Sequence, residues 1–280
     1  MRKTVVFLSD FGSSDGAVSA MHGVADQVSA DLKLEDLTHD IPQFNIWEAS
    51  YRLAQTLPYW APGTVFVCVV DPGVGSDRKS LVALTNDGHI VVTPDNGTLT
   101  HIERRIGLKE VRELHVETNR LAGSQKSHTF FGRDVYAYNG ARLASGELAF
   151  RDCGPVLEEF IRLEVEEQRR EGETIIGAID ILDTRYGSLW TNINGDLLDE
   201  IGVTWGDYLH VRITKDNRIV YGYPLRLCKA FTDVPKGEAL MYINSLLNIA
   251  VALNQGNFAS TYSIGTGEGW KITFSKYDTP

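Results

Sequence analysis

The chain has 280 residues, a length that suits one large domain or two modest ones with cores of their own. Its hydrophobic fraction of 43% and charged fraction of 23% are ordinary for a soluble globular protein. The formal net charge of −10 disfavours nucleic acid as a partner, because no basic stripe is present to neutralise phosphates. The same charge favours a cationic small substrate, although solubility is a sufficient explanation for it.

Neither a secretory leader nor a membrane anchor is expected. Only four apolar residues follow the basic pair near the N-terminus before a polar loop begins, which is too short for a leader. No run approaches the roughly 20 apolar residues of a membrane helix. The three cysteines, Cys68, Cys153 and Cys228, are far apart and lack metal-ligand spacing. They indicate reduced thiols and a cytoplasmic location.

The first part of the chain alternates predicted strands and helices. Residues 3–8 are a short apolar run ending in a polar loop, and residues 16–30 carry apolar side chains at helical spacing. Residues 64–70 are dense in β-branched side chains and predict a central parallel strand. Further predicted elements are a helix over 47–59, a hairpin of 81–85 and 89–93, and a helix over 134–146. We therefore expect a Rossmann-like α/β domain over residues 1–165, with a mostly parallel sheet and functional loops at the strands' carboxyl ends.

The composition changes over residues 158–173, which are rich in charge, and this predicts a domain boundary. Short alternating apolar runs follow it, and only residues 246–253 hint at a helix. The alternating runs are 175–181, 208–213, 219–223, 239–244 and parts of 261–274. The pattern predicts a smaller second domain over residues 174–280, a β-barrel or a sandwich.

Two glycine-rich loops follow predicted strands. In SDFGSSDG, the carboxylate of Asp10 either accepts hydrogen bonds from a sugar diol or has a structural capping role, and for Asp15 the role of a helix cap is favoured. In DPGVGSDR, Arg78 is expected to lower the pKa of Asp71 and keep it ionised. Such a pair can orient a water molecule, and the alternative is a surface ion pair of little energetic value. Neither loop is a Walker phosphate site.

Three later segments offer further candidates. SHTFFGRD contributes His128, Arg133 and Asp134, and His128 is either a general base or an ordinary loop histidine. No nucleophile elbow, HExxH or CxxC motif is present, so no metal site is expected. DTRYGSLWTNI gathers Asp183, Tyr186, Trp190 and Asn192 in a predicted turn that could clamp a cation or stack on a base, with barrel packing favoured for the tryptophan. Within residues 243–257, Asn244, Ser245 and Asn254 are candidates to form hydrogen bonds with a ligand.

The ordered set SDFG, VDPGVGS, PDNG, TFxGRD, WTNI and NS resembles the S-adenosyl-L-methionine hydroxide adenosyltransferases over nearly the whole chain. That family includes hydrolases that form adenosine and methionine, and it is related to enzymes that halogenate the same substrate at the 5′ carbon. The resemblance implies an N-terminal α/β domain and a C-terminal β-barrel. It also implies a homotrimer that holds S-adenosyl-L-methionine between the N-domain of one subunit and the C-domain of the next, without a cofactor.

The resemblance also implies roles for individual residues. It places Asp10 at the ribose diol, Phe44 beside the ribose, Asp183 at the methionine amino group, Tyr186 against adenine, Ser245 at the methionine carboxylate, and Asn254 and Gln255 at the adenine edge. Ser188 replaces an asparagine that is common in the family. Asp71 and Arg78 match two members of an Asp–Arg–His set. Phe131 occupies the position of the third member, where the halogenating relatives carry tyrosine.

The implied reaction is an in-line displacement at the ribose 5′ carbon, with a neutral thioether as the leaving group. We expect Asp71 to accept a hydrogen bond from the attacking water and Arg78 to orient Asp71. Loss of the histidine predicts a rate lowered by roughly 10²- to 10⁴-fold, unless His128 substitutes for it. The alternatives are a halide-using enzyme, which the negative charge of Asp71 disfavours, and a non-catalytic binder of S-adenosyl-L-methionine or adenosine.

Overall fold

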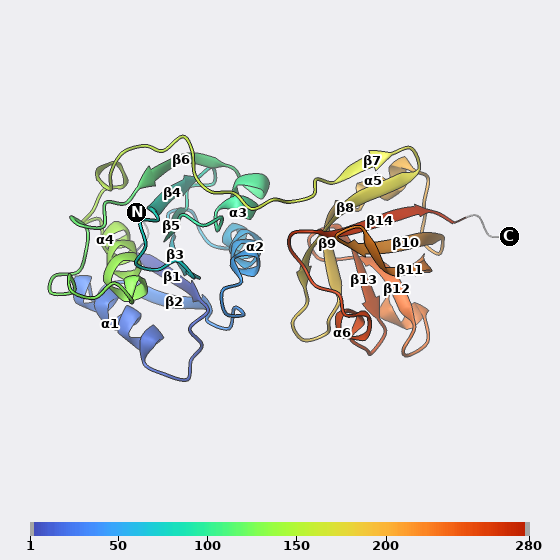
Figure 1. Ribbon diagram of the computed structural model, residues 1–280, viewed down its shortest axis with the longest axis horizontal. Helices are drawn as coiled ribbons and strands as arrows, with labels where there is room; N and C mark the ends of the chain where they lie inside the picture. Colours follow the sequence, from blue (N-terminus) through green and yellow to red (C-terminus); the bar gives the residue numbers. More distant parts are fainter. Residues whose placement is uncertain (1–2, 278–280) are drawn as a thin grey trace. The chain divides into compact units, whose positions relative to one another are not determined.

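The computed structural model describes residues 3–277, which divide between Leu163 and Glu164 into two compact units (Figure 1). The sequence placed the end of the first domain at residue 165 and the start of the second at residue 174. Two contacts attach the intervening segment to the second unit. The side-chain amide of Asn192 donates to the carbonyl oxygen of Glu166 at 2.7 Å. Strand β7 (Arg169–Glu171) pairs with β8 (Thr174–Leu182).

The first unit is built on a six-stranded sheet with the order β2-β1-β3-β5-β4-β6. The first four strands in this order are parallel, and β4 is antiparallel to both its neighbours. The sequence did not predict β2 and β6, the two edge strands, because their charged sequences resemble loops. The strands are β1 (Thr4–Ser9), β2 (Lys33–Thr38), β3 (Val65–Val69), β4 (Ser80–Thr85), β5 (Ile90–Pro94) and β6 (Leu108–Glu113).

Helices cover both faces of this sheet (Figure 1). On β1, Val5 and Phe7 join the core beneath α1 and α4, whereas Val6 and Leu8 join the core beneath α2 and α3. This alternation confirms the predicted α/β fold, because a strand buried on both faces carries apolar residues at every position. The helical elements are α1 (Ala17–Val28), α2 (Ile46–Thr56), η1 (Leu57–Tyr59), α3 (Thr100–Arg105), the π-helix η2 (Gly132–Ala137), α4 (Tyr138–Ser145) and η3 (Phe150–Asp152).

The second unit is a closed barrel of seven strands in the order β14-β10-β11-β12-β13-β9-β8, and a β14–β8 pairing completes the circle. Inward-facing side chains such as Val211, Val251 and Phe274 fill its core. The barrel strands after β8 are β9 (Leu189–Asn194), β10 (Tyr208–Lys215), β11 (Arg218–Leu227), β12 (Ala239–Ile243), β13 (Asn248–Leu253) and β14 (Trp270–Lys276). The short helices are α5 (Asp196–Glu200), η4 (Phe231–Asp233) and α6 (Phe258–Tyr262).

The helix suggested for residues 246–253 is wrong, because β13 pairs with both β12 and β9. Four consecutive residues of β13 are buried, so its sequence shows no alternation that would distinguish a strand from a helix. Within residues 3–277, no helix is long and apolar enough to cross a membrane.

Candidate active site

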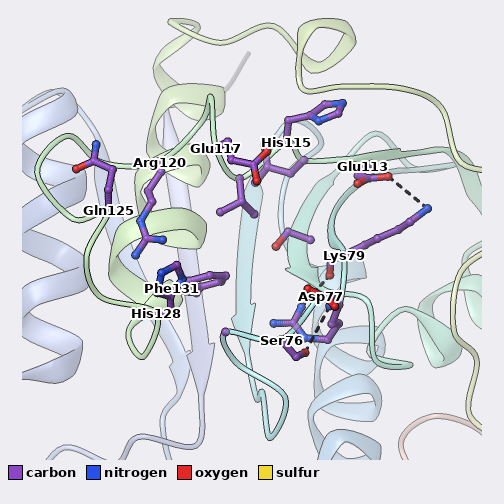
Figure 2. Close-up of a pocket in the computed structure, with 15 residues that line it drawn as sticks. Ser76, Asp77, Lys79, Glu113, His115, Glu117, Arg120, Gln125, His128 and Phe131 are labelled. Atoms are coloured by element: carbon purple, nitrogen blue, oxygen red, sulfur yellow. Dashed lines mark hydrogen bonds and ion pairs between the residues drawn. The ribbon is translucent and has the colours of Figure 1, made fainter.

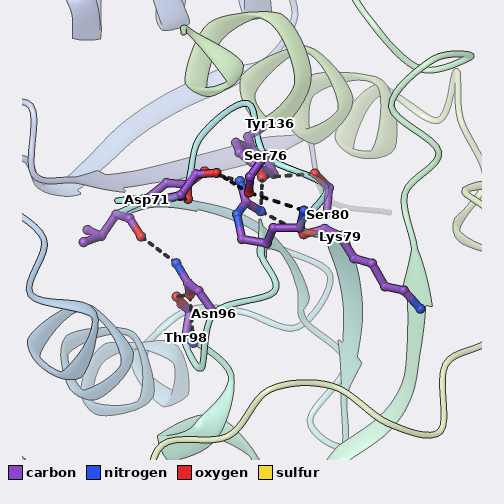
Figure 3. Close-up of polar contacts among 10 residues, drawn as sticks. Asp71, Ser76, Lys79, Ser80, Asn96, Thr98 and Tyr136 are labelled. Carbon is purple, nitrogen blue, oxygen red and sulfur yellow. Dashed lines mark hydrogen bonds and ion pairs between the residues drawn. The ribbon is translucent and has the colours of Figure 1, made fainter. Parts of the chain in front are cut away.

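The carboxyl ends of three neighbouring parallel strands carry the polar loops of the first unit. Asp10 follows β1, Asp71 follows β3, and Asn96 lies just after β5. The side-chain amide of Asn96 donates to the carbonyl oxygen of Val70 at 2.8 Å and ties two of these loops together (Figure 3). This edge is where ligands bind in open α/β sheets.

Asp71 and Arg78 form a buried ion pair. Their side chains are 3% and 11% exposed, so the alternative of a surface pair does not apply. One guanidinium nitrogen, Nη2, donates to Asp71 Oδ2, and the backbone N–H of Gly73 donates to Oδ1 at 3.2 Å. The other nitrogen, Nη1, donates to the Tyr136 hydroxyl at 3.0 Å and to the Lys79 carbonyl oxygen at 2.8 Å. Both members of the pair are therefore fixed in orientation.

Burial determines the ionisation of these groups. Loss of hydration raises the pKa of Asp71, and the opposing effect of Arg78 does not reverse this. The expected lowering of the pKa of Asp71 is therefore wrong. The negative charge of Asp10 also contributes to the raised pKa of Asp71. Burial also raises the pKa of Tyr136 to about 12, so its hydroxyl stays protonated.

The protonated hydroxyl of Tyr136 links this pair to the sheet. Because Arg78 can only donate, the tyrosine oxygen accepts, and its own proton is available to Ser80 Oγ at 3.0 Å (Figure 3). Tyr136 lies in the π-helix η2, and π-helical turns are frequent at functional sites.

The glycine-rich loop after β3 packs against the segment that contains His128. Gly75 has a φ of +80°, and a Cβ atom there would lie 2.5 Å from the carbonyl oxygen of His128. Only glycine therefore permits this approach. The contact brings Arg78, His128 and Phe131 to the wall of one cavity of about 490 Å³ (Figure 2).

Phe131 is buried in this wall and is 6% exposed. The guanidinium carbon of Arg120 lies 5.1 Å from the centroid of its ring, and the His128 ring centroid lies 6.4 Å away (Figure 2). The ring thus offers a face to a cation but cannot exchange a proton. His128 is exposed and lines the same cavity.

Arg133 and Asp134 of this segment have a structural role. The Asp134 side chain is fully buried, and its Oδ1 accepts from Arg133 Nε at 2.7 Å. Its Oδ2 lies 3.9 Å from Arg120 Nη2, so Asp134 anchors the chain on both sides of the His128 loop. Asp15 Oδ1 accepts from the backbone N–H of Ala17 at 2.9 Å, but the N-cap of α1 is Gly16 and no side chain caps this helix. The predicted capping role of Asp15 is therefore wrong, because it lies one residue before the cap.

Asp10 and Phe44 are in direct contact. The backbone N–H of Phe44 donates to Asp10 Oδ2 at 2.9 Å. Phe44 has a φ of +66° and leaves 64% of its surface exposed. A left-handed conformation is unusual for a bulky side chain, and such strain is often found at functional sites.

The second unit has a cavity of its own, of about 660 Å³. It brings together five residues that the sequence singled out: Asp183, Tyr186, Ser188, Asn254 and Gln255. Asp183 Oδ1 accepts from the backbone N–H groups of Arg185 and Tyr186, each at 3.0 Å. Its Oδ2 makes no hydrogen bond within residues 3–277, so one carboxylate oxygen remains available to a ligand.

Sequence reasoning missed two aromatic residues in this cavity, Phe231 and Tyr242, whose ring centroids lie 5.0 Å apart. Tyr242 lies on β12, and its hydroxyl accepts from Trp190 Nε1 at 3.1 Å. Trp190 and Asn192 lie on β9 and not in a turn, which corrects the sequence interpretation. Asn192 also accepts from the backbone N–H of Ala178 at 2.8 Å, so its side chain has a structural role.

Asn244 and Ser245 do not line this cavity. They lie in the turn between β12 and β13, where Asn244 Oδ1 accepts from Leu246 N at 2.9 Å. The backbone groups of Asn254 are also occupied, since its N–H donates to the Glu238 carbonyl oxygen at 2.9 Å and its own carbonyl accepts from Gly237 at 2.8 Å.

Of the two residues expected to contact the adenine edge, Gln255 has the backbone groups that remain available to a ligand. Its backbone groups make no hydrogen bond within the described part of the chain, and its φ is +53°. It lies in an exposed turn on the wall of the cavity. Its backbone can therefore present both a donor and an acceptor to a ligand.

Both units of the chain match models of one protein family. Residues 5–154 match the SAM hydroxide adenosyltransferase N-terminal domain, and residues 177–271 match the C-terminal domain. The chain therefore belongs to the S-adenosyl-L-methionine (SAM) hydroxide adenosyltransferase family.

Named relatives and a solved structure align with this chain over nearly its whole length and nearly the whole of theirs. The chain is 32% identical to the (R)-S-adenosyl-L-methionine hydrolase of Salinispora tropica, over 96% of this chain and 97% of that protein. It is 25% identical to the fluorinase of Actinopolyspora mzabensis, over 98% of each. The crystal structure of an uncharacterized conserved protein from Thermotoga maritima superposes with a TM-score of 0.86 at 32% identity, covering 97% of this chain and 100% of that one.

Proposed function

We propose that this protein hydrolyses S-adenosyl-L-methionine to adenosine and L-methionine by attack of water on the ribose 5′ carbon. Family membership and the hydrolase relatives support the substrate. The main support for hydrolysis as the reaction is the buried Asp71–Arg78 pair at the carboxyl end of β3. A carboxylate at this point favours water over a halide anion, because like charges repel.

The pair supplies a positioned acceptor for the attacking water. Each Asp71 oxygen accepts one protein hydrogen bond and retains lone-pair capacity for a water proton. Arg78 is held on its far side by Tyr136, so Asp71 does not reorient as charge develops on the water. A sulfonium departs as a neutral thioether, so this step needs no general acid, metal or cofactor.

The remaining expected contacts divide between the two units. We assign Asp10 and Phe44 in the first unit to the ribose. In the second unit, the available oxygen of Asp183 suits an ammonium group. The other contacts proposed in the cavity of the second unit are Tyr186 against adenine, the Gln255 backbone at the adenine edge and Ser188 at the amino-acid portion. Family resemblance alone supports Asn254 at the adenine edge and Ser245, with its neighbour Asn244, at the amino-acid portion.

A complete site then requires residues of both units. By family resemblance, we propose a homotrimer in which the first unit of one copy and the second unit of another hold one substrate molecule. We also propose a cytoplasmic location, which three free cysteines favour.

Product analysis tests the reaction. The purified protein is incubated with S-adenosyl-L-methionine in chloride buffer, and the products are separated by chromatography and identified by mass. Adenosine and methionine in equal amounts are expected, with an Asp71→Asn variant as the control. The fluorinase relatives make 5′-halogenation the second candidate, and 5′-chloro-5′-deoxyadenosine as the main product would establish it. Saturable binding in calorimetry without any product would instead indicate a non-catalytic binder.

A further inference from the structure

Two histidines converge on one carboxylate oxygen at the edge of the first unit. His22 Nε2 lies 2.8 Å from Asp36 Oδ1, and His39 Nε2 lies 3.0 Å from the same oxygen. The three residues come from α1, from β2 and from the segment after β2. One ligand atom from each lies within 4.8 Å of the other two. Their separation in the sequence matches no metal-binding motif, so the sequence did not reveal the cluster.

The surroundings hold the His39 ring firmly and support one side of the His22 ring. Ser9 Oγ lies 2.6 Å from His39 Nδ1 and also accepts from the backbone N–H of Phe11 at 3.2 Å. The His22 ring packs against the buried ring of Phe7, with centroids 4.9 Å apart. Histidine ligands of metal ions commonly hold their second nitrogen as His39 does, which sets the tautomer and the ring orientation.

The strand that carries Asp36 is irregular at this point. Phe7 pairs with Asp36, but Leu8 pairs with Thr38, so Leu37 is an extra residue in β2. Such bulges redirect side chains and often lie beside functional sites. Asp36 is 41% exposed, and His39 is 8% exposed. The cluster is therefore anchored on one side and open to solvent on the other.

We propose that His22, Asp36 and His39 bind a zinc ion, with solvent completing its coordination. Imidazole nitrogen and carboxylate oxygen are both ligands of zinc, at about 2.0–2.2 Å. Tetrahedral coordination at this length separates ligand atoms by about 3.3 Å. The two separations from Asp36 Oδ1 are 2.8 and 3.0 Å, so small outward movements admit the ion. His22 is 30% exposed and has room for such a movement.

Zinc binding at this cluster would also stabilise the loop that contains Asp10, because His39 is hydrogen-bonded to that loop. The carbonyl oxygen of His39 accepts from the backbone N–H of Gly12 at 2.8 Å, and Ser9 immediately precedes Asp10. With zinc on Nε2, His39 Nδ1 carries the proton and donates to Ser9 Oγ. The ion would thus hold α1, β2 and the loop after β1 together. The proposal concerns a structural site and does not depend on the hydrolysis proposed above.

Metal titration of the whole chain tests the site. Metal-free protein is titrated with zinc against a chromophoric chelator, and one ion per chain is expected. The His22→Gln variant keeps a donor toward Asp36 but removes a good ligand, and its zinc affinity should fall by at least about 10- to 100-fold. Ser9→Ala, which releases the His39 ring, should lower the affinity by a similar factor. The matched control is His210→Gln on β10, which should leave the affinity unchanged.

A second measurement separates zinc ligation from a simple hydrogen-bonded cluster. Cobalt(II) in a His–His–Asp site should give visible absorption bands that disappear in His22→Gln and persist in His210→Gln. Thermal melting of each metal-free variant checks folding, and Asp36→Asn replaces His22→Gln if that variant does not fold. The proposal is overturned if micromolar zinc does not bind, or if His22→Gln and His210→Gln bind it equally well.

Discussion

Phe131 lines the same cavity as Arg78 at the position where family resemblance leads us to expect histidine. Its ring is buried against the guanidinium of Arg120, so it excludes water without taking part in proton transfer. In the proposed hydrolase, Asp71 is then the acceptor for water, position 131 supplies no imidazole, and His128 is the imidazole that lines this cavity.

The first prediction restores the imidazole. Phe131→His should raise the turnover of S-adenosyl-L-methionine, by up to roughly 10²- to 10⁴-fold if the histidine acts as a general base. The rate of adenosine formation measures it. Phe131→Leu, which alters the ring but adds no proton acceptor, is the matched control and should not raise turnover. Equal rates for the wild-type protein and Phe131→His would remove position 131 from the nucleophile site.

The second prediction concerns pH. Because burial raises the pKa of Asp71, its carboxylate is protonated up to a higher pH than an exposed aspartate, whose pKa is about 3.9. A protonated Asp71 cannot accept a proton from water, so turnover should rise with pH through this pKa. The acidic limb of the pH–rate profile should therefore lie above the ordinary aspartate range.

Asp71→Asn provides the control for that profile. Asparagine keeps the shape but cannot ionise, so this acidic limb should disappear and turnover should fall by about 10²- to 10⁴-fold. An unchanged acidic limb in Asp71→Asn would mean that another group controls the profile, and His128 would then be the next residue to replace.

At the scale of elements, the site depends on close packing between the loop after β3 and the segment before η2. The third prediction is that Gly75→Ala separates them, because its Cβ would meet the His128 carbonyl oxygen at 2.5 Å. A displacement of about 1 Å at a reacting group can lower the rate by roughly 10²-fold. Steady-state kinetics and thermal melting measure the two effects.

Gly146→Ala is the matched control for this strain. Gly146 also has a positive φ, +85°, but a Cβ there meets nothing within 4 Å. Both variants should lose about 1–2 kcal/mol from the left-handed backbone alone. Only Gly75→Ala should also lose activity, and a loss of equal size in Gly146→Ala would show that global destabilisation is the cause.

The sequence predicted the elements best where burial leaves an unambiguous pattern. The apolar run before Asp71 could only be a buried strand, and β3 lies in the middle of the sheet. By contrast, β2 and β6 lie at the edges and carry charged residues, whereas β13 is buried at four consecutive positions. In both situations the neighbours of the strand, and not its own sequence, decide its conformation.

At the scale of the whole molecule, the fourth prediction tests whether two copies share one site. Light scattering should give three times the 31.1 kDa mass of the chain. Asp71→Asn and Asp183→Asn alter different units, and each should be nearly inactive alone. When the two variants are refolded together, mixed trimers should regain activity, because some sites then combine two unaltered units. No recovery in mixtures that form trimers would place both residues of each site in one chain.

The sequence by itself determined the family through its local motifs, and the α/β fold of the first unit through its pattern of apolar residues. It also predicted the pairing of Asp71 with Arg78, whereas the choice of a barrel over a sandwich came from the family resemblance. Only the tertiary structure showed that burial raises the pKa of Asp71 and that Tyr136 holds Arg78. It alone brought Phe231 and Tyr242 into the barrel cavity and gathered His22, Asp36 and His39. The physical reason is that hydration and distance depend on residues far apart in the chain, which meet only when the sheet and the barrel close.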